Sequence, residues 1–181
     1  MQHQTDRATL DATVRAHYPQ VKRFVRNKIP EPDCYDLANE AMRVFLSRDP
    51  STIVKPKSYL WGIVRMLVFK YAHGKRPMIA FDSELHSIAE FRTSISTVTV
   101  RRNRLLTALA TLPMDHQTAF ELHYAEELTL AEVAEVLEKS VAQTKRYIAS
   151  AKQKLAAELG LPPESFSNLE TQQIVNAYRE S

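Results

Sequence analysis

Glycine and cysteine are both scarce in this chain, which has three glycines and a single cysteine, Cys34, among 181 residues. One cysteine excludes an internal disulfide and a metal cluster held by several thiolates. No apolar run approaches the roughly 18 to 20 residues that a membrane-spanning helix requires. The first residues also lack the apolar core of a signal peptide. We therefore expect a cytoplasmic protein with no membrane insertion.

Features of an enzyme are also missing. The six histidines show no metal-ligand spacing backed by carboxylates, and the chain has no glycine-rich phosphate loop or nucleophile elbow. We expect no enzymatic activity, no metal and no cofactor. The net charge is only +3, but the basic residues are clustered, and clustering favours a polyanionic partner more than the total charge does.

Apolar residues recur at helical spacing along most of the chain, which predicts an all-α fold. We expect two small helical domains, at 7–76 and 98–161, joined by a linker at 77–97. A tail at 162–181 can form one more short helix. In the first domain we predict helices at about 7–28, from an N-cap at Asp33 to about 48, and from about 56 to 76, with a loop at 49–52. In the second, Asp115 is expected to cap a helix.

The stretch 128–155 predicts two helices joined by a tight turn. Thr129 with Glu132 fits a capping box at the start of the first, and Ser140 with Gln143 repeats the start signal. The expected lengths are about two and about four turns. The turn lacks the usual glycine, because Glu138 and a lysine occupy it.

Charge differs sharply between these two helices. The first carries three glutamates, whereas the second has no acidic residue between Lys139 and Lys154. That asymmetry is typical of a helix-turn-helix whose second helix lies in the DNA major groove. A helical hairpin with a solvated basic face explains the same pattern, and both interpretations stay open.

A second basic stretch lies at 53–76, and no acidic residue occurs between Pro50 and Phe81. Aromatic residues are interleaved with its cations, as a site for single-stranded nucleic acid requires, where each stacked base contributes roughly 1–3 kcal/mol. We expect Phe69 and Tyr71 to belong to the core. Trp61 is either a core residue or a stacking platform.

Several segments together resemble a bacterial RNA polymerase sigma factor of the extracytoplasmic-function type, within the sigma-70 family. The resemblance covers about 16–159. In the first half it rests on HYPQVKRFVRNKI, DCYDLANEAMRVFL and KPKSYLWGIVRMLVFKYAHGKR. In the second half it rests on LATLPMDHQTAFELHYAEELTLAEVAEVLEKSVAQTKRYIASAKQKL, which is similar to the domain that reads the minus-35 promoter element.

The resemblance implies partners and roles for matched positions. Core RNA polymerase and promoter DNA are the implied partners. The residues facing the polymerase clamp helices would be Asp33, Asp36, Leu37, Glu40 and Arg43. The melted minus-ten strand would be captured by the loop at 51–58 and by residues just beyond it. The residues implied are Lys55, Lys57, Ser58, Trp61 and Arg65. Those facing the minus-35 element would be Gln143, Lys145, Arg146, Ala149 and Ser150, with Lys152 nearer the phosphates.

One departure from the family concerns the polymerase-binding helix. Members commonly carry Asp-Ala-Glu-Asp-Leu there, whereas this chain has Tyr35 where the second acid belongs. An anti-sigma factor usually restrains the family, and a Ser/Thr kinase controls a minority with a degraded acidic motif. We therefore hypothesise that a phosphate on Thr52, or else Ser51, replaces the lost carboxylate, provided that the loop folds back beside Asp33 and Asp36.

Two other classes of protein remain as alternatives. A helix-turn-helix repressor or activator that binds duplex DNA as a dimer would explain 128–155 but not the acid-free basic stretch. A protein-binding helical adaptor is disfavoured by the excess of basic residues on two separate helices.

Overall fold

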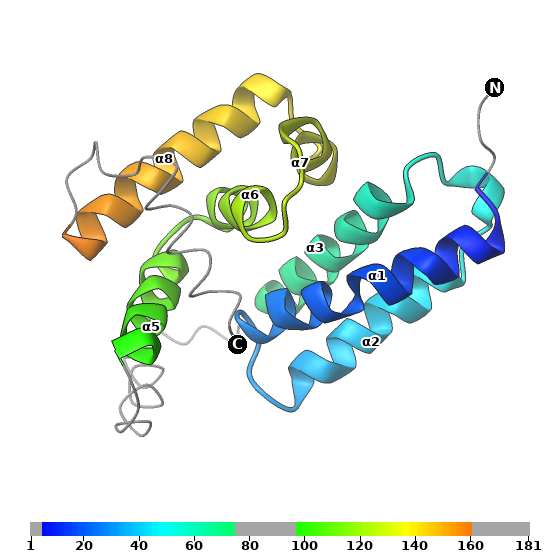
Figure 1. The fold of residues 1–181 in the computed structure, drawn as a ribbon, viewed down its shortest axis with the longest axis horizontal. Helices are drawn as coiled ribbons and strands as arrows, with labels where there is room; N and C mark the ends of the chain where they lie inside the picture. The colour runs from blue at the N-terminus through cyan, green and yellow to red at the C-terminus, as the bar shows by residue number, and fades with distance from the viewer. Residues whose placement is uncertain (1–4, 75–96, 161–181) are drawn as a thin grey trace.

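The computed structural model describes residues 5–74 and 97–160 (Figure 1). These residues form seven α-helices and one short 3-10 helix, with no strand among them, so the all-α prediction is confirmed. The expected tail and all of the expected linker except Thr97, which begins a helix, lie outside the described residues.

The first three helices pack side by side as a bundle (Figure 1). They are α1 (Arg7–Arg26), α2 (Asp33–Leu46) and α3 (Pro56–Gly74). Each contributes large apolar side chains to one core, including Phe24, Phe45, Leu60 and Trp61, all at most 1% exposed. Burying each such side chain stabilises the fold by roughly 1.5–3 kcal/mol before the entropy of ordering is counted.

The start of α2 differs from the prediction. Pro32 occupies the N-cap position without a side-chain hydrogen bond, and Asp33 is the first helical residue, so the predicted cap at Asp33 is wrong. The Asp33 carboxylate instead accepts a hydrogen bond of 2.6 Å from the Tyr71 hydroxyl of α3. The expected loop after α2 contains a 3-10 turn, η1 (Pro50–Thr52), whose N-cap Asp49 accepts from the amide of Ser51.

The remaining helices form the second half of the molecule: α5 (Thr97–Ala110), α6 (Met114–Tyr124), α7 (Leu130–Leu137) and α8 (Val141–Leu159). The capping box of Thr129 and Glu132 is present, and the Ser140 side chain caps α8, as predicted. At 19 residues α8 has about five turns rather than four. Pro113 precedes α6 at the cap position, so the predicted cap at Asp115 is wrong.

The turn between α7 and α8 forms without a glycine. Glu138 itself adopts the left-handed conformation, with φ 56°, and its amide bonds back to the end of α7. Glycine adopts this conformation at less cost, but a single non-glycine residue there is tolerated. The tight turn fixes the angle between α7 and α8.

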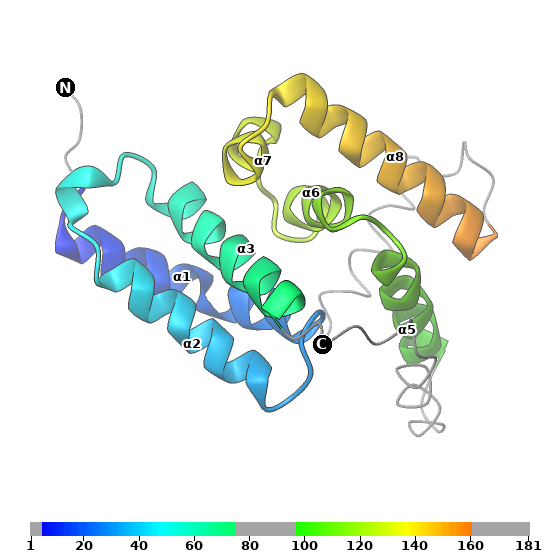
Figure 2. The same cartoon turned by 180° about the vertical axis from the view of Figure 1, so that it is seen from behind.

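The two halves are in direct contact, with α7 lying against α3 (Figures 1 and 2). One cluster of buried residues runs from the three-helix bundle into α6 and α7, through Leu122, Leu128, Val133 and Val136. A separate cluster joins α5, α6 and α8. The second half therefore has its own small core and also shares the core of the first.

Candidate nucleic-acid interface

The outer face of α8 carries the residues predicted to read the minus-35 element. Thr144, Ile148, Ala151 and Leu155 are buried and hold the helix against the second half. The predicted DNA-facing residues lie off this stripe and none is buried: Lys145, Arg146 and Ala149 are exposed, while Gln143, Ser150 and Lys152 are half-buried. The structure thus exposes Lys145, Arg146 and Ala149 on the outer side of α8, with Gln143, Ser150 and Lys152 at the margins of this surface.

Two contacts orient individual side chains of α8. Arg146 lies one turn from Gln143, with Nη1 3.5 Å from the Gln143 amide oxygen. Lys152 turns inward, with its ammonium 3.4 Å from the Tyr124 hydroxyl and 5.4 Å from the centre of that ring. Lys152 is therefore partly engaged by α6.

Tyr147 anchors the same helix to α6. Its ring stacks on His116 with centroids 4.6 Å apart. Burial, helped by the charge of Lys154, lowers the pKa of His116, which favours the neutral imidazole. A neutral ring avoids placing a partly buried charge beneath the side of α8 that carries the predicted DNA-facing residues.

The cations predicted to hold the melted minus-ten strand all have carboxylate partners from the second half. Lys55 pairs with Glu135 of α7. Arg65 donates to Asp115 of α6 at 2.9 Å. The sequence predicted these cations but not their partners, which lie 50 to 80 residues further along the chain.

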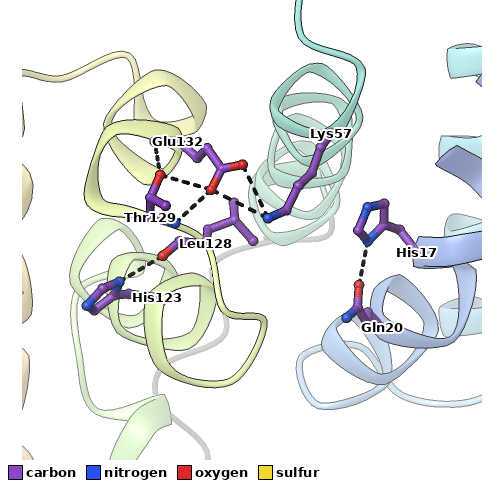
Figure 3. A network of polar contacts seen from close by, with 7 residues as sticks. All are labelled: His17, Gln20, Lys57, His123, Leu128, Thr129 and Glu132. Carbon is purple, nitrogen blue, oxygen red and sulfur yellow. Dashed lines mark hydrogen bonds and ion pairs between the residues drawn. The ribbon is translucent and has the colours of Figure 1, made fainter. Parts of the chain in front are cut away.

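Lys57 makes the third of these contacts (Figure 3). It reaches from α3 to Glu132, with Nζ 3.2 Å from Oε1, while the same carboxylate accepts from the amide and hydroxyl of Thr129. Burial raises the pKa of Glu132, but the bonds from Thr129 and Lys57 outweigh it and lower the pKa overall. Glu132 therefore stays ionised while it caps α7 and holds α3.

Ser58 and Trp61 are buried, unlike the three cations near them. Ser58 is 8% exposed and Trp61 only 1%, with its ring edge-to-face against Phe24 at 5.4 Å. This placement favours the core interpretation of Trp61, since no face of the indole is accessible for stacking in this conformation.

Exposed apolar side chains lie instead on the other face of α3, beside an open groove of about 810 Å³. Tyr59, Met66 and Phe69 are 40–51% exposed and line it together with Arg48 and Lys55. The expectation that Phe69 belongs to the core is wrong, because α3 has apolar residues on two faces and the bundle covers only one. The spacing of 59, 66 and 69 is the signal that could have revealed this stripe.

The residues predicted to face the polymerase lie along α2. Asp36 and Arg43 are exposed, while Asp33, Leu37 and Glu40 are half-buried. Their spacing of three or four residues places them on neighbouring turns of one helix face. Arg43 forms an exposed ion pair with Glu40 at 2.6 Å, which lowers the pKa of the Glu40 carboxyl.

Tyr35, at the position of the missing acid, has an acidic neighbour. Its hydroxyl donates to Glu31 at 2.9 Å, and Lys22 lies 4.7 Å from its ring centre. The hydrogen bond to Glu31 raises the pKa of Tyr35, so the phenol stays neutral. The negative charge next to the Tyr35 hydroxyl therefore belongs to Glu31.

The turn proposed for phosphorylation lies at the opposite end of the bundle from Asp33. Ile53, which follows it, accepts a hydrogen bond from Thr5, and Arg7 donates to Leu46, so η1 adjoins the beginning of α1 and the end of α2. The 14 residues of α2 span roughly 20 Å. The condition that this loop folds back beside Asp33 and Asp36 is therefore not met.

No helix in the described residues is long and apolar enough to cross a membrane. Within the same residues, no group of three or more histidine, cysteine, aspartate or glutamate side chains is placed to hold a metal ion.

Comparison with known families finds a match within the helix-turn-helix half. Residues 102–155 match the family described as sigma-70, region 4, a segment that includes all of α6 and α7 and most of α8. No curated protein matches the chain significantly. The match supports a DNA-binding role in transcription initiation for this half of the chain.

Proposed function

We propose that this protein is a sigma factor of the extracytoplasmic-function type, which binds core RNA polymerase and directs it to specific promoters. The observation that carries the proposal is the sigma-70 region 4 match at 102–155, in which α8, the second helix of the helix-turn-helix, exposes Lys145, Arg146 and Lys154. The protein would act in the cytoplasm beside polymerase, without enzymatic activity, metal or cofactor of its own.

Recognition of the minus-35 element would use the first turns of α8. The N-terminal residues of a recognition helix reach base edges in the major groove. Arg146 is suited to guanine and Gln143 to adenine, because each can form two hydrogen bonds to that base. Lys145 and Lys152 would contact phosphates, with Ala149 and Ser150 close to the bases.

Capture of the melted minus-ten strand would use the N-terminal part of α3. Lys55, Lys57 and Arg65 would supply charge for phosphates, and the ring of Tyr59, which is 40% exposed, would stack on a base. Ser58 and Trp61 would support this surface from beneath, since both are buried.

Polymerase binding would use the surface of α2 that carries Asp33, Asp36, Leu37, Glu40 and Arg43. The decisive experiment is transcription in vitro with core polymerase and a promoter selected from genomic fragments. A sigma factor programmes core enzyme to start at a defined site. A duplex-binding repressor or a protein-binding adaptor leaves core enzyme without promoter selectivity, and that result would reject the proposal.

Arg146→Ala should weaken promoter binding by about 1–3 kcal/mol, if the guanidinium makes a bidentate contact with guanine. Folding should be little affected, because Arg146 is exposed and lies off the buried stripe of α8. The measurement is holoenzyme affinity for promoter DNA with and without the minus-35 element.

Lys154→Ala is the matched control, since it removes one exposed cation from the same helix nearer its end. Lys154→Ala should lower the affinity of the holoenzyme slightly, and by the same factor for DNA with and without the minus-35 element. Unchanged affinity in folded Arg146→Ala protein would exclude the assigned contact.

Control by phosphorylation of Thr52, or else Ser51, is the regulatory part of the proposal. Both residues are exposed. A phosphate adds about −1.5 to −2 charges and three acceptor oxygens. Thr52 lines the groove with Arg48 and Lys55, so the phosphate would compete with Glu135 for Lys55 and loosen the contact of α7 with the start of α3, rather than replace the carboxylate lost at Tyr35.

Thr52→Glu should therefore raise promoter-directed transcription, and Thr52→Ala should lower it in cells where the protein is active. Tyr35→Glu is the comparison, because it restores an acid at the other end of α2. Mass spectrometry of protein from those cells checks for the phosphate. Full activity of a Ser51→Ala/Thr52→Ala double variant would refute this regulation and leave an anti-sigma factor as the expected restraint.

A further inference from the structure

The contact between the two halves has one consistent charge pattern. Six ion pairs occur among the described residues, and five of them join the halves. In each of the five the base belongs to the first half, residues 5–74, and the acid belongs to the second half, residues 97–160. The pairs are Arg23–Glu126, Lys28–Glu121, Lys55–Glu135, Lys57–Glu132 and Arg65–Asp115.

Three of these bases are the cations assigned above to the melted strand, so the inference rests on the proposed function. A cation that donates to a carboxylate cannot at the same time give those hydrogen bonds to a phosphate. We propose that the contact is an autoinhibitory clasp, in which carboxylates of α6 and α7 occupy the phosphate-binding groups of α3. The clasp is defined as these five ion pairs together with the apolar contact of α7 on α3.

Burial shows that the clasp is a built interface rather than a loose encounter. Val133, Val136 and Leu137 of α7 belong to the same apolar cluster as Trp61 and Val64 of α3. Such contact removes apolar surface from water on both halves, which stabilises the closed arrangement.

The two ion pairs nearest α1 are also desolvated. The Lys28 and Glu121 side chains are 5% and 1% exposed, and those of Arg23 and Glu126 are 17% and 0% exposed. Buried pairs resist screening by salt, whereas the exposed Lys55–Glu135 pair is screened readily. The outer pairs are therefore the part of the clasp that a competing polyanion can displace first.

Promoter geometry requires the clasp to open. Elements centred about 25 base pairs apart lie about 85 Å apart along B-DNA, at 3.4 Å per base pair. A compact chain of this length has a radius of gyration of only about 16 Å. With α7 held on α3, the surfaces of α3 and α8 cannot reach both elements together, so the closed protein is unable to engage a promoter in full.

Zero-length carbodiimide crosslinking of the full chain tests the clasp directly. The reagent activates a carboxylate, and an amine already in contact displaces the activating group to form an amide. We expect mass spectrometry to find Lys55–Glu135 and Lys57–Glu132 crosslinks in the free protein. Adding core RNA polymerase, or a single-stranded oligothymidylate in excess, should remove both crosslinks.

A pair of acid-side variants tests the masking while leaving every proposed DNA-binding cation in place. The double variant Asp115→Asn/Glu135→Gln should raise affinity for oligothymidylate by roughly 2- to 30-fold. This range corresponds to the loss of two partly exposed ion pairs that compete with the oligonucleotide. Asp11→Asn with Glu158→Gln is the matched control, because it removes two carboxylates that lie outside the clasp. It should give a smaller rise and leave the crosslinks unchanged.

The outcomes separate the clasp from the proposed function. Absence of both crosslinks in the free protein would overturn the clasp, whatever the protein does in transcription. Crosslinks that persist with polymerase bound and active would overturn its inhibitory role. Failure to programme core polymerase, with crosslinks present in the free protein, would overturn the sigma-factor assignment and with it the inhibitory role.

Discussion

Replacing Trp61 with alanine should cost about 3–5 kcal/mol of folding free energy, the usual range for a large aromatic side chain removed from a core. Trp61 is 1% exposed and packs edge-to-face on Phe24 of α1, so its removal leaves a cavity between α1 and α3. Urea denaturation followed by circular dichroism measures the loss, since the chain has no second tryptophan for fluorescence.

Trp61→Phe is the matched control for this variant. It keeps a ring against Phe24 and removes an indole N–H that is buried without a hydrogen-bond partner among the described residues. Trp61→Phe should cost much less folding free energy than Trp61→Ala, because a ring still fills the site and no hydrogen-bond partner is lost. The opposite pattern, with Trp61→Ala as stable as the wild type but deficient in single-strand binding, would show that Trp61 stacks on bases.

Local signals account for the parts of the fold that the sequence predicts well. The capping box of Thr129 and Glu132 and the cap at Ser140 involve residues three positions apart, so the chemistry that starts each helix is readable in a short window.

Long-range partners account for the two helix caps that the sequence predicts wrongly. Asp33 and Asp115 have the residue type of an N-cap, but one accepts from Tyr71 and the other from Arg65, both on α3. A proline occupies each cap position instead. No local pattern reveals that a distant donor will bind an aspartate more favourably than the helix start does.

The interface between the halves was only partly visible in the sequence. The stretch around α3 has no acid, whereas α7 has two glutamates and a third, Glu138, directly follows it, so complementary charge was apparent. Which lysine meets which glutamate depends on how two helices 80 residues apart pack together, as for Lys55 and Glu135. Composition therefore predicts that two surfaces attract each other, and the packing of the helices decides their pairing.

The buried ion pair of Lys28 and Glu121 should produce the other large effect. Lys28→Met leaves a carboxylate that is 1% exposed with Gln117 as a remaining neutral donor at 3.1 Å. An uncompensated buried charge costs about 3–5 kcal/mol. Burial already lowers the pKa of Lys28, although Glu121 opposes that shift, so desolvation is substantial at this site.

The protein can avoid that cost by separating its halves, because the pair lies between α6 and the turn after α1. If the two halves separate, water reaches Glu121, and the variant then loses at most the free energy of the clasp. The Lys55–Glu135 crosslink would disappear in that case. Lys28→Met combined with Glu121→Leu should recover most of the stability, since replacing both charges with apolar groups is often neutral or stabilising. Denaturation midpoints and crosslink yields for the single and double variants measure both effects. If Lys28→Met alone has the wild-type denaturation midpoint and the full crosslink yield, the Lys28–Glu121 pair stabilises neither the fold nor the clasp.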